Sequence, residues 1–546
     1  MQIIKQKSYL KKLSAVLFLT LATGITIYAQ QTENFTKQLK LLPGEVWWGG
    51  VVNRGIEMPF GKKNFSFDLY GNDDGNQGSP LLLSNKGRQV WSESPYKFIF
   101  RNDSLLIQSR FNNFFVEQSG ASLKEAYRSA SKKYFPSTGL WPDSLLITAP
   151  QYNLWIELMY KPNQKDVLDY ANKVLKNGLP PGVLMIDDNW TNYYGQFDFD
   201  KEKFPAPKEM IMQLHSMGFK VMLWICPFIS PDSEPYRELA AAKYLLLDNE
   251  GKTEASYKDV TKPLIMQWWN GYSACLDLTN PSSAEWIKKK LATLQQKYGV
   301  DGFKLDGGDA HYYDDKKLVS YENKNPNEHT YLWAKLGLSF PLNEYRAMWK
   351  MGGQPLVQRL RDKAHSWADL NTLIPGTIAQ QLLGYTFTCP DMIGGGEFST
   401  FLGDSKIDQK LIVRSAQCSA LMPMMQFSVA PWRILDTLHL NAVKKAVATR
   451  QKYLPVLMEV LRTAAITGEP VLRPLEYDYP NQGFENVPDE FLIGEKLLVA
   501  PVVTDNDSRT VKFPKGKWRY NNKTIKGPAT KVFTVALDEL LIFEKQ

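Results

Sequence analysis

The sequence predicts a multidomain chain of α/β and β structure, with a (β/α)8 TIM barrel between an N-terminal antiparallel β-sandwich and a C-terminal β-domain. Three observations lead to this prediction. The 546 residues exceed what one hydrophobic core usually supports. Short strand-like runs separated by turn residues occupy both ends of the chain. Between them, apolar strands alternate with helical patterns, as in a barrel of β-α units.

The start of the chain, residues 1–29, is expected to be a secretory signal peptide. Four lysines precede an apolar stretch that ends in the small residue Ala29, and no cysteine offers a lipid anchor. The alternative is a membrane anchor, but Ser, Thr and Gly interrupt the apolar run and no second spanning segment follows. We therefore expect a periplasmic or secreted protein without a membrane span after cleavage.

Residues 30–145 are predicted to form the β-sandwich. The runs "FSFDLY", "PLLLSN", "RQVWSE", "YKFIFRN" and "SLLIQS" are separated by clusters of Gly, Asn, Asp and Ser. This spacing of short strands and turns is typical of antiparallel sheets.

Residues 146–470 are predicted to form the barrel and its trailing helices. The helical pattern "NQKDVLDYANKVLKNG" lies between the apolar runs "YNLWIELMY" and "GVLMIDDNW", which gives one β-α-β unit. The alternation continues through "FKVMLWICPF", "VDGFKLDGGD", "QPLVQRL", "YTFTCPDMIGGG" and "LMPMMQFSV". Strands and turns return in residues 471–546, which are predicted to be the C-terminal β-domain.

Composition and charge exclude several classes of function. The formal net charge is +8, and the four lysines of the leader account for half of it, so the remaining charge is too weak to indicate a nucleic-acid partner. The four cysteines and five histidines are scattered, so neither a metal site nor a disulfide framework is indicated. The cysteines are expected to be buried thiols, with a single disulfide as the alternative.

Polar and aromatic residues stand at the ends of several predicted barrel strands. Active sites of this fold lie at the carboxyl ends of the strands. A single carboxylate there often only caps the next helix, but a convergent set indicates a binding site. The set comprises Asp187, Asp188, Trp224, Asp306, Arg359, Arg361, Asp391 and Gln426.

The stretch "DGFKLDGGD" presents Asp306 most clearly. Phe303 and Leu305 are expected to pack inside the barrel wall, while Asp306 emerges at its mouth. Gly307 and Gly308 would let the backbone clear a ligand that approaches closely. Asp306 is therefore predicted to face a substrate.

Carboxylates together with many Trp and Tyr residues indicate a sugar site. Pyranoses offer hydroxyls to carboxylates and an apolar face to aromatic rings. Two carboxylates suffice for glycoside hydrolysis, one as nucleophile and one as acid and base. The spacing of the carboxylates in the sequence does not show which two act together.

Four segments resemble glycoside hydrolase family 31, in particular its branch with myogenesis-regulating glycosidase and bacterial α-galactosidases. They are "DGFKLDGGD", "WADLNTLIPGTIAQQLLGYTFTCPDMIGGG", "MPMMQFSVAPWR" and "GEKLLVAPVV". The resemblance covers the barrel and the C-terminal β-structure. It implies a retaining exo-α-glycosidase with the domain order predicted above.

The resemblance also implies roles for individual residues. Asp306 matches the nucleophile and Asp369 in "HSWADL" the acid/base, with Asp362 and His365 as competitors. Asp187 or Asp188 stands where the family binds non-reducing-end hydroxyls, and Gln426 stands where many α-glucosidases carry histidine. The other expected substrate contacts are Trp224, Lys304, Arg359, Arg361, Trp367 and Asp391.

The combined reading is an α-galactosidase that needs no cofactor or metal and acts on an α-galactoside oligosaccharide or glycoconjugate. One alternative is an α-glucosidase or α-xylosidase on the same scaffold. Another is a carbohydrate-binding barrel without turnover. A transglycosylase is the third, because an acceptor sugar could replace water.

The leader hypothesis predicts that the mature chain begins at Gln30 or Gln31. N-terminal sequencing of the protein from its native host measures this directly. A cytosolic protein that retains residues 1–20 would contradict the hypothesis.

Overall fold

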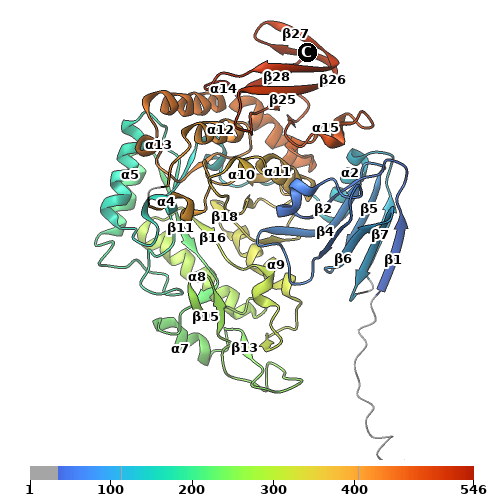
Figure 1. Ribbon diagram of the computed structural model, residues 1–546. Helices are drawn as coiled ribbons and strands as arrows, with labels where there is room; N and C mark the ends of the chain where they lie inside the picture. Colours follow the sequence, from blue (N-terminus) through green and yellow to red (C-terminus); the bar gives the residue numbers. More distant parts are fainter. Residues whose placement is uncertain (1–34, 112, 404) are drawn as a thin grey trace, which may run out of the picture.

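A computed structural model describes residues 35–111, 113–403 and 405–546 (Figure 1). The expected signal peptide lies outside the described residues. Within those ranges, no helix is both long and apolar enough to cross a membrane.

Two facing sheets form the N-terminal β-sandwich, to the right of the barrel in Figure 1. The sheets pack closely, since the Phe98 ring of the first lies against Gly50 of the second. Helix α2, Leu123–Tyr134, follows the sandwich. Its N-cap is Ser122, whose side chain accepts a hydrogen bond from the Glu125 amide. The first sheet has the order β1 (Phe35–Lys40), β7 (Ser104–Ser109), β6 (Lys97–Arg101) and β3 (Phe65–Asp68); the second contains β2 (Trp47–Val51), β4 (Gln77–Ser84), β5 (Arg88–Ser92) and β8 (Phe114–Gln118).

Eight parallel strands form the barrel, and a bridge between Met392 and Gln426 brings the two end strands together. All four residues of Val183–Ile186 are buried, as expected for a strand covered on both faces. In spatial order the strands are β21 (Phe387–Cys389), β20 (Val357–Arg359), β18 (Asn343–Tyr345), β16 (Gly302–Leu305), β11 (Lys220–Ile225), β10 (Val183–Ile186), β9 (Gln151–Asn153) and β22 (Gln426–Phe427).

Amphipathic helices surround the strands. In α5, Gln164–Lys176, the side chain of Asn163 caps the first turn, and Val167, Ala171 and Val174 are buried against the barrel. The other long helices of the barrel are α6 (Pro207–Ser216), α8 (Pro281–Tyr298), α9 (Pro326–Leu336), α11 (Leu373–Leu382) and α12 (Gln409–Ser419).

A long insertion separates β11 from α8 and forms the lower part of the molecule in Figure 1. It contains β12 (Phe228–Ile229), α7 (Glu234–Ala241) and an antiparallel hairpin of β14 (Met266–Trp268) and β15 (Gly271–Cys275). The two residues of the hairpin tip, Trp269 and Asn270, therefore reach the carboxyl ends of the barrel strands.

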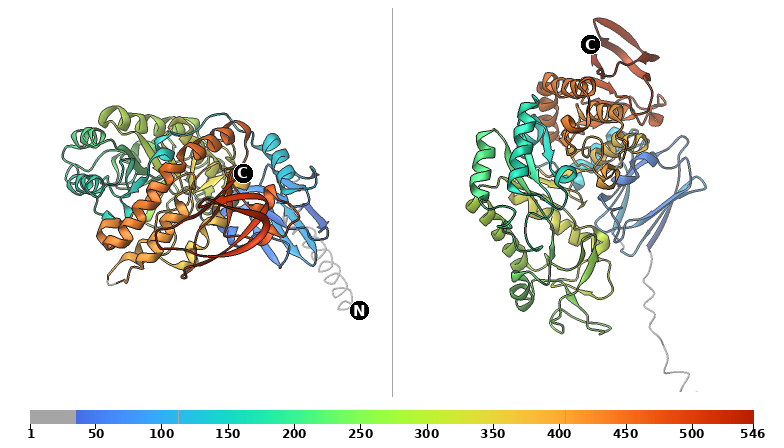
Figure 2. Two further views of the ribbon diagram at one scale, coloured as in Figure 1. Left: turned by 90° about the horizontal axis from the view of Figure 1, so that it is seen from above. Right: turned by 60° about the vertical axis from the view of Figure 1, so that its left-hand side comes forward.

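The C-terminal part begins with α14, Thr437–Thr467, and ends in one antiparallel sheet that lies on the far side of the barrel from the insertion (Figure 2). This sheet has the order β23 (Leu472–Arg473), β24 (Phe491–Ile493), β25 (Leu497–Ala500), β28 (Leu541–Lys545), β26 (Ser508–Tyr520) and β27 (Lys523–Thr534).

The predicted fold class is confirmed: a β-sandwich, a (β/α)8 barrel and a C-terminal β-domain follow one another. One barrel strand has no counterpart among the apolar runs of the sequence, because β18 is the polar segment Asn343–Tyr345. All four cysteines are buried and unpaired, as expected.

Arg450 on α14 joins the trailing helix to the barrel. Its guanidinium donates to the carbonyls of Ile147, Ala420, Met422 and Pro423 at 2.6–3.1 Å. Burial lowers its pKa to about 10, and no described carboxylate pairs with it. These four carbonyls therefore receive hydrogen bonds from one buried cation.

Arg450→Met is predicted to lower the free energy of unfolding by about 3–5 kcal/mol, because it leaves buried carbonyls without donors. Arg462→Met, on the exposed side of the same helix, is the matched control and should change stability little. Equal effects of the two substitutions in denaturant titrations would contradict this role.

Candidate active site

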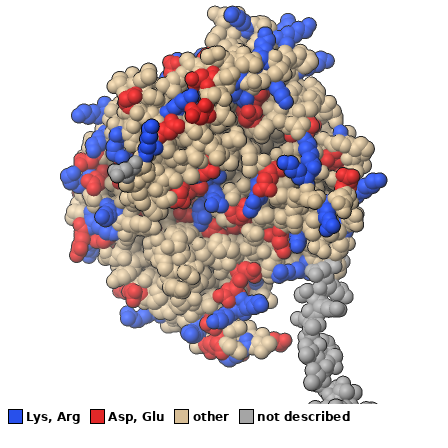
Figure 3. All heavy atoms as spheres, viewed as in Figure 1, with Lys and Arg blue, Asp and Glu red and all other residues tan. Residues whose placement is uncertain are grey.

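A cavity of about 560 Å³ opens at the carboxyl ends of the barrel strands. Acidic and basic side chains lie side by side near the middle of the face shown in Figure 3. Of the residues named from the sequence, the cavity is lined by Asp187, Asp188, Trp224, Lys304, Asp306, Arg361 and Asp362.

Asp306, directly after β16, is held on both carboxylate oxygens. Oδ1 accepts from Arg346 Nε at 2.8 Å and from the Gly307 amide at 2.9 Å, while Oδ2 accepts from Trp224 Nε1 at 2.9 Å. Lys304 Nζ lies 3.9 Å from Oδ2. Burial alone would raise the pKa of Asp306, but these cations and hydrogen bonds outweigh it and hold the pKa well below its usual range. Asp306 is therefore a fixed anion at neutral pH.

The two glycines after Asp306 have a steric reason. Gly307 and Gly308 have φ of 67° and 74°, in the left-handed region. A Cβ at Gly308 would stand 2.3 Å from the Trp333 ring. Glycine thus lets the chain turn sharply past a buried indole and leave Asp306 facing the cavity.

Asp187 and Asp188 follow β10 and are held differently. Asp187 Oδ2 accepts from Lys304 Nζ at 2.7 Å, and both side chains of this ion pair are 5% exposed. Asp188 accepts from Tyr194 Oη at 3.1 Å and from Asn270 Nδ2 at 2.7 Å. Burial and the neighbouring charge of Asp187 raise the pKa of Asp188 to about 7. One wall of the cavity therefore carries an ion-paired carboxylate, Asp187, beside a carboxyl group whose pKa is near neutrality, Asp188.

A third cluster lies at the ends of β20 and β21. Arg359 Nη1 donates to Asp362 Oδ1 at 2.6 Å and to Asp391 Oδ1 at 2.8 Å. Asp391 has φ of 95°, which is strained for a residue with a Cβ, and burial raises its pKa to about 7. The side chain of Asp362 is 37% exposed and lines the cavity. Arg359 and Asp391 lie behind Asp362 and orient it.

Asp369 does not line the cavity. It lies in the first turn of the short helix α10, Trp367–Leu370, where its amide is capped by Ser366 and its Oδ2 accepts from the Ala364 amide at 2.5 Å. Trp367 donates to Asp408 instead of facing the cavity. His365 is fixed between the Gly394 carbonyl and the Asp408 amide. Of the three acid/base candidates from the sequence, only Asp362 reaches the cavity.

Gln426 lies below the cavity, inside the barrel. Its Nε2 donates to Gln151 at 2.6 Å and to Glu344 at 2.7 Å, and it is fully buried. Gln426 therefore does not reach a ligand in the cavity.

Several residues of the cavity were not predicted. Arg346 follows the polar strand β18 and was missed with it. Trp269 and Asn270 belong to the hairpin tip, and Asn270 reaches Asp188 from there. Aromatic residues after β9 and in a later loop complete the wall: Trp155, Tyr160 and Phe398. The dipeptide "WN" between two strand-like runs was the only sequence signal for the tip.

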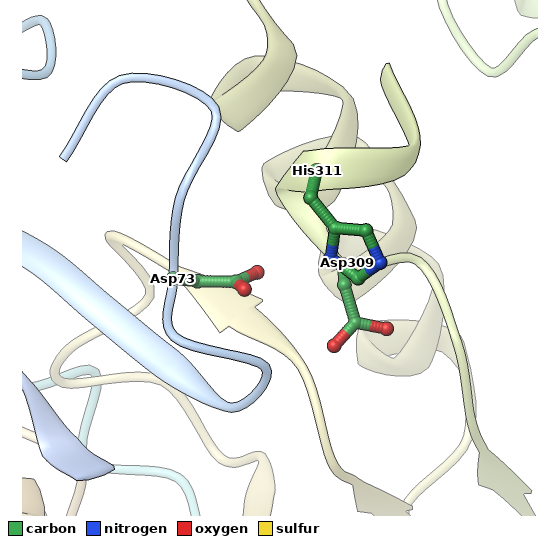
Figure 4. Close-up of side chains that lie close together, drawn as sticks. All are labelled: Asp73, Asp309 and His311. Atoms are coloured by element: carbon green, nitrogen blue, oxygen red, sulfur yellow. The ribbon is translucent and has the colours of Figure 1, made fainter. Parts of the chain in front are cut away.

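Asp73, Asp309 and His311 form the one group among the described residues with the composition of a metal site (Figure 4). Three of its four carboxylate oxygens already have donors: both oxygens of Asp73 accept from the Gly75 and Ala310 amides, and Asp309 Oδ2 accepts from Arg346 at 2.6 Å. A cation there would stand beside a guanidinium. We therefore assign no metal to this group.

Comparison with known proteins identifies the family. The model for the TIM-barrel domain of glycosyl hydrolases family 31 matches residues 149–460, and the model for the C-terminal domain of the same family matches residues 468–546. The chain belongs to glycosyl hydrolase family 31.

Individual relatives show how far the likeness extends. Myogenesis-regulating glycosidase of Mus musculus is 30% identical over 414 residues, which cover 73% of this chain and 56% of the relative. Alpha-glucosidase 2 of Bacillus thermoamyloliquefaciens is 26% identical over 70% of this chain and 50% of the relative. The chain thus spans about half the length of these curated relatives.

Solved structures share the fold. A GH31 dextranase of Flavobacterium johnsoniae complexed with glucose superposes with a TM-score of 0.80 at 20% identity, over 94% of this chain and 66% of that chain. A GH31 sulfoquinovosidase from E. rectale gives the same score at 19% identity, over 94% of this chain and 82% of that chain.

The buried pair Lys304 and Asp187 is predicted to be strongly coupled. Lys304→Met should lower the free energy of unfolding by about 3–5 kcal/mol, because Asp187 is left as a buried unpaired anion. Adding Asp187→Asn should restore part of the loss in a double-mutant cycle.

The exposed pair Lys165 and Asp169 on α5 is the matched control, with side chains 79% and 47% exposed. It should show little or no coupling. Additive effects of the Lys304 and Asp187 substitutions would show that the buried pair does not act as a unit.

Proposed function

We propose that the protein is a retaining exo-α-glycosidase that hydrolyses terminal α-linked galactose. The observation that carries the proposal is Asp306, a carboxylate kept ionised by Arg346 and Lys304 while it faces a cavity that Asp362 also lines. An ionised carboxylate and a second, more accessible carboxyl group are what a double displacement needs.

In the first step, Asp306 attacks the anomeric carbon and forms a β-glycosyl-enzyme. The hydrogen bonds from Arg346 and Trp224 hold both of its oxygens in place, so little reorganisation accompanies the attack. Asp362 donates its proton to the glycosidic oxygen, which leaves with the aglycone.

In the second step, Asp362 takes a proton from water, and the water attacks the same carbon from the face that the aglycone left. The two inversions release α-galactose and restore Asp306. Arg359 Nη1 donates to Asp362 Oδ1 at 2.6 Å and so holds the Asp362 side chain in place during both steps.

The acid/base assignment is tested by comparing Asp362→Ala with Asp369→Ala. Substrates with acidic leaving groups need little protonation, so Asp362→Ala should retain far more activity on dinitrophenyl than on alkyl α-glycosides. Azide should accelerate this variant by attacking the β-glycosyl-enzyme in place of water, and it should yield the α-glycosyl azide.

Asp369→Ala is the matched control and should keep the dependence of the wild type on the leaving group. Asp306→Asn should abolish turnover of every substrate. If Asp369→Ala instead shows the altered dependence and azide rescue, Asp369 is the acid/base.

Galactose is supported by the wall that contains Asp187 and Asp188. Galactose differs from glucose in the axial O4, so selection requires polar groups beside that hydroxyl. Asp187 can accept a hydrogen bond from a hydroxyl, and Asp188, with a pKa of about 7, can donate or accept one. Lys304 adds a donor next to Asp187, so the wall can bond two neighbouring hydroxyls. The resemblance to the galactosidase branch favours the same sugar.

The sugar assignment predicts that p-nitrophenyl α-galactoside is cleaved with a kcat/KM at least about 100-fold above that of the α-glucoside. Asp187→Asn or Asp188→Asn should reduce this ratio. A glucoside or xyloside cleaved equally well would replace galactose but leave the mechanism, whereas β-galactose as the first product in proton NMR would exclude retention.

The α-galactoside is expected outside the cytoplasm, as a free oligosaccharide or as part of a glycoconjugate. The proposed export rests on the basic and apolar pattern of residues 1–29. The cavity of about 560 Å³ has room for the terminal sugar and part of its neighbour.

A further inference from the structure

A buried pair of carboxyl groups joins the β-sandwich to the barrel behind the nucleophile. Asp73 lies in the loop before β4 of the sandwich, and Asp309 lies three residues after Asp306. Both side chains are fully buried, and one oxygen atom of Asp73 lies within 4.8 Å of one oxygen atom of Asp309 (Figure 4). The pair therefore links two domains next to the proposed reaction centre.

One oxygen of this pair lacks a donor. Asp309 Oδ1 is buried and accepts no hydrogen bond from the described residues, whereas Oδ2 accepts from Arg346 Nη2 at 2.6 Å. Both oxygens of Asp73 accept hydrogen bonds from backbone amides. A proton on Asp73 would remove the repulsion between two buried anions, of which only Asp309 is paired with a guanidinium.

The same loop of the sandwich holds Arg346 at several points. The guanidinium of Arg346 donates to the Gly75 carbonyl at 3.3 Å, and the backbone carbonyl of Arg346 accepts from Asn76 Nδ2 at 2.9 Å. Strand β4 then pairs with β19 (Met348–Trp349), two residues after Arg346. Arg346 in turn donates to Asp306. The sandwich therefore positions the cation that binds the nucleophile.

We infer that the buried pair of Asp73 and Asp309 holds one proton between the two carboxyl groups, on Asp73, and that this acid and carboxylate pair positions Arg346 against Asp306. Asp73 and Asp309 are positioning residues, because neither lines the cavity. The proton stays on the pair and no covalent step involves it. The inference deepens the proposed function and rests on it for the role of Asp306, but the shared proton can be tested without catalysis.

The charged and titratable groups that face the pair determine its pH dependence. They are Arg346, His311, Tyr312, Tyr313 and Tyr385, and of these only Arg346 is a cation throughout the neutral range. Burial and the charge of Asp309 raise the pKa of Asp73 to about 7, above its value in the unfolded chain. The folded protein therefore holds the proton more tightly than the unfolded chain, and this stabilisation is present at low pH and is lost as pH rises through 7.

The first experiment measures Tm for the wild type and Asp73→Asn between pH 5.5 and 8.5. Asparagine keeps a donor at any pH, so the Tm of the wild type should fall relative to that of the variant by on the order of 3 °C across this range. Asp68→Asn, an exposed aspartate of the same domain, is the control and should follow the wild type. A constant difference between the wild type and Asp73→Asn would overturn the shared proton.

The second experiment measures activity on an α-galactosyl fluoride, whose leaving group needs no protonation. At pH 6, Asp73→Asn should stay within about 3-fold of the wild type, and Asp73→Ala should lose about 10-fold or more in kcat/KM. As the pH rises through 7 and Asp73 ionises, the wild type should lose activity, whereas the two variants should show no loss from this group. Equal losses in the asparagine and alanine variants would overturn the positioning role.

The two experiments separate the two proposals. If no α-glycoside is cleaved, the proposed function fails while the Tm series still decides whether the pair shares a proton. Equilibrium dialysis against Zn²⁺ or Mn²⁺ adds a third arm. One tightly bound ion in the wild type that is lost in Asp73→Asn would show a metal site and overturn the shared proton.

Discussion

The ion pair between Arg346 and Asp306 is the interaction on which the barrel mouth depends. Taking the Asp306 carboxylate out of water costs several kcal/mol unless cations and donors replace its hydration. Arg346 and Lys304 provide the charge, and Trp224 and the Gly307 amide complete the hydrogen bonds. Each cation then needs its own carboxylate, Asp309 for Arg346 and Asp187 for Lys304. The neighbouring charges thus alternate in sign from β10 to the sandwich.

This array explains why the domains are packed together. Arg346 can bind Asp306 only if its backbone and its guanidinium are both held, and the sandwich supplies those contacts through the Gly75 carbonyl and the Asn76 side chain. The sandwich is therefore part of the site. Buried charges of this kind stabilise the fold weakly, so the apolar barrel wall and the sheet cores carry most of the stability.

The sequence predicted the fold class because most barrel strands are apolar and most helices carry a clear buried face. It missed β18, whose Asn343 and Glu344 are buried inside the barrel, because a polar strand does not differ from a loop in hydrophobic pattern. Arg346 was lost with that strand. Asp306, Asp187 and Asp188 could be predicted because each directly follows an apolar strand.

The choice between Asp362 and Asp369 depended on three-dimensional structure. Asp362 follows the end of β20 by three positions and Asp369 by ten, and the order of residues alone does not show which one turns toward the cavity. Ser366 and the Ala364 amide hold Asp369 in a helix cap, whereas Arg359 draws Asp362 to the barrel mouth. The position of Gln426 could not be predicted for a similar reason, because a residue at the end of a strand can point into the barrel below the cavity.

The hairpin of β14 and β15 has a consequence for how related enzymes diverge. Its tip carries Trp269, which is 44% exposed, and Asn270, which bonds Asp188. The strands of the hairpin pair with each other and with β12, outside the eight barrel strands. A change of length or sequence at the tip would therefore remodel the entrance without disturbing the register of the barrel strands. Evolution could exchange the chemical group that is accepted next to the sugar by altering this insertion alone.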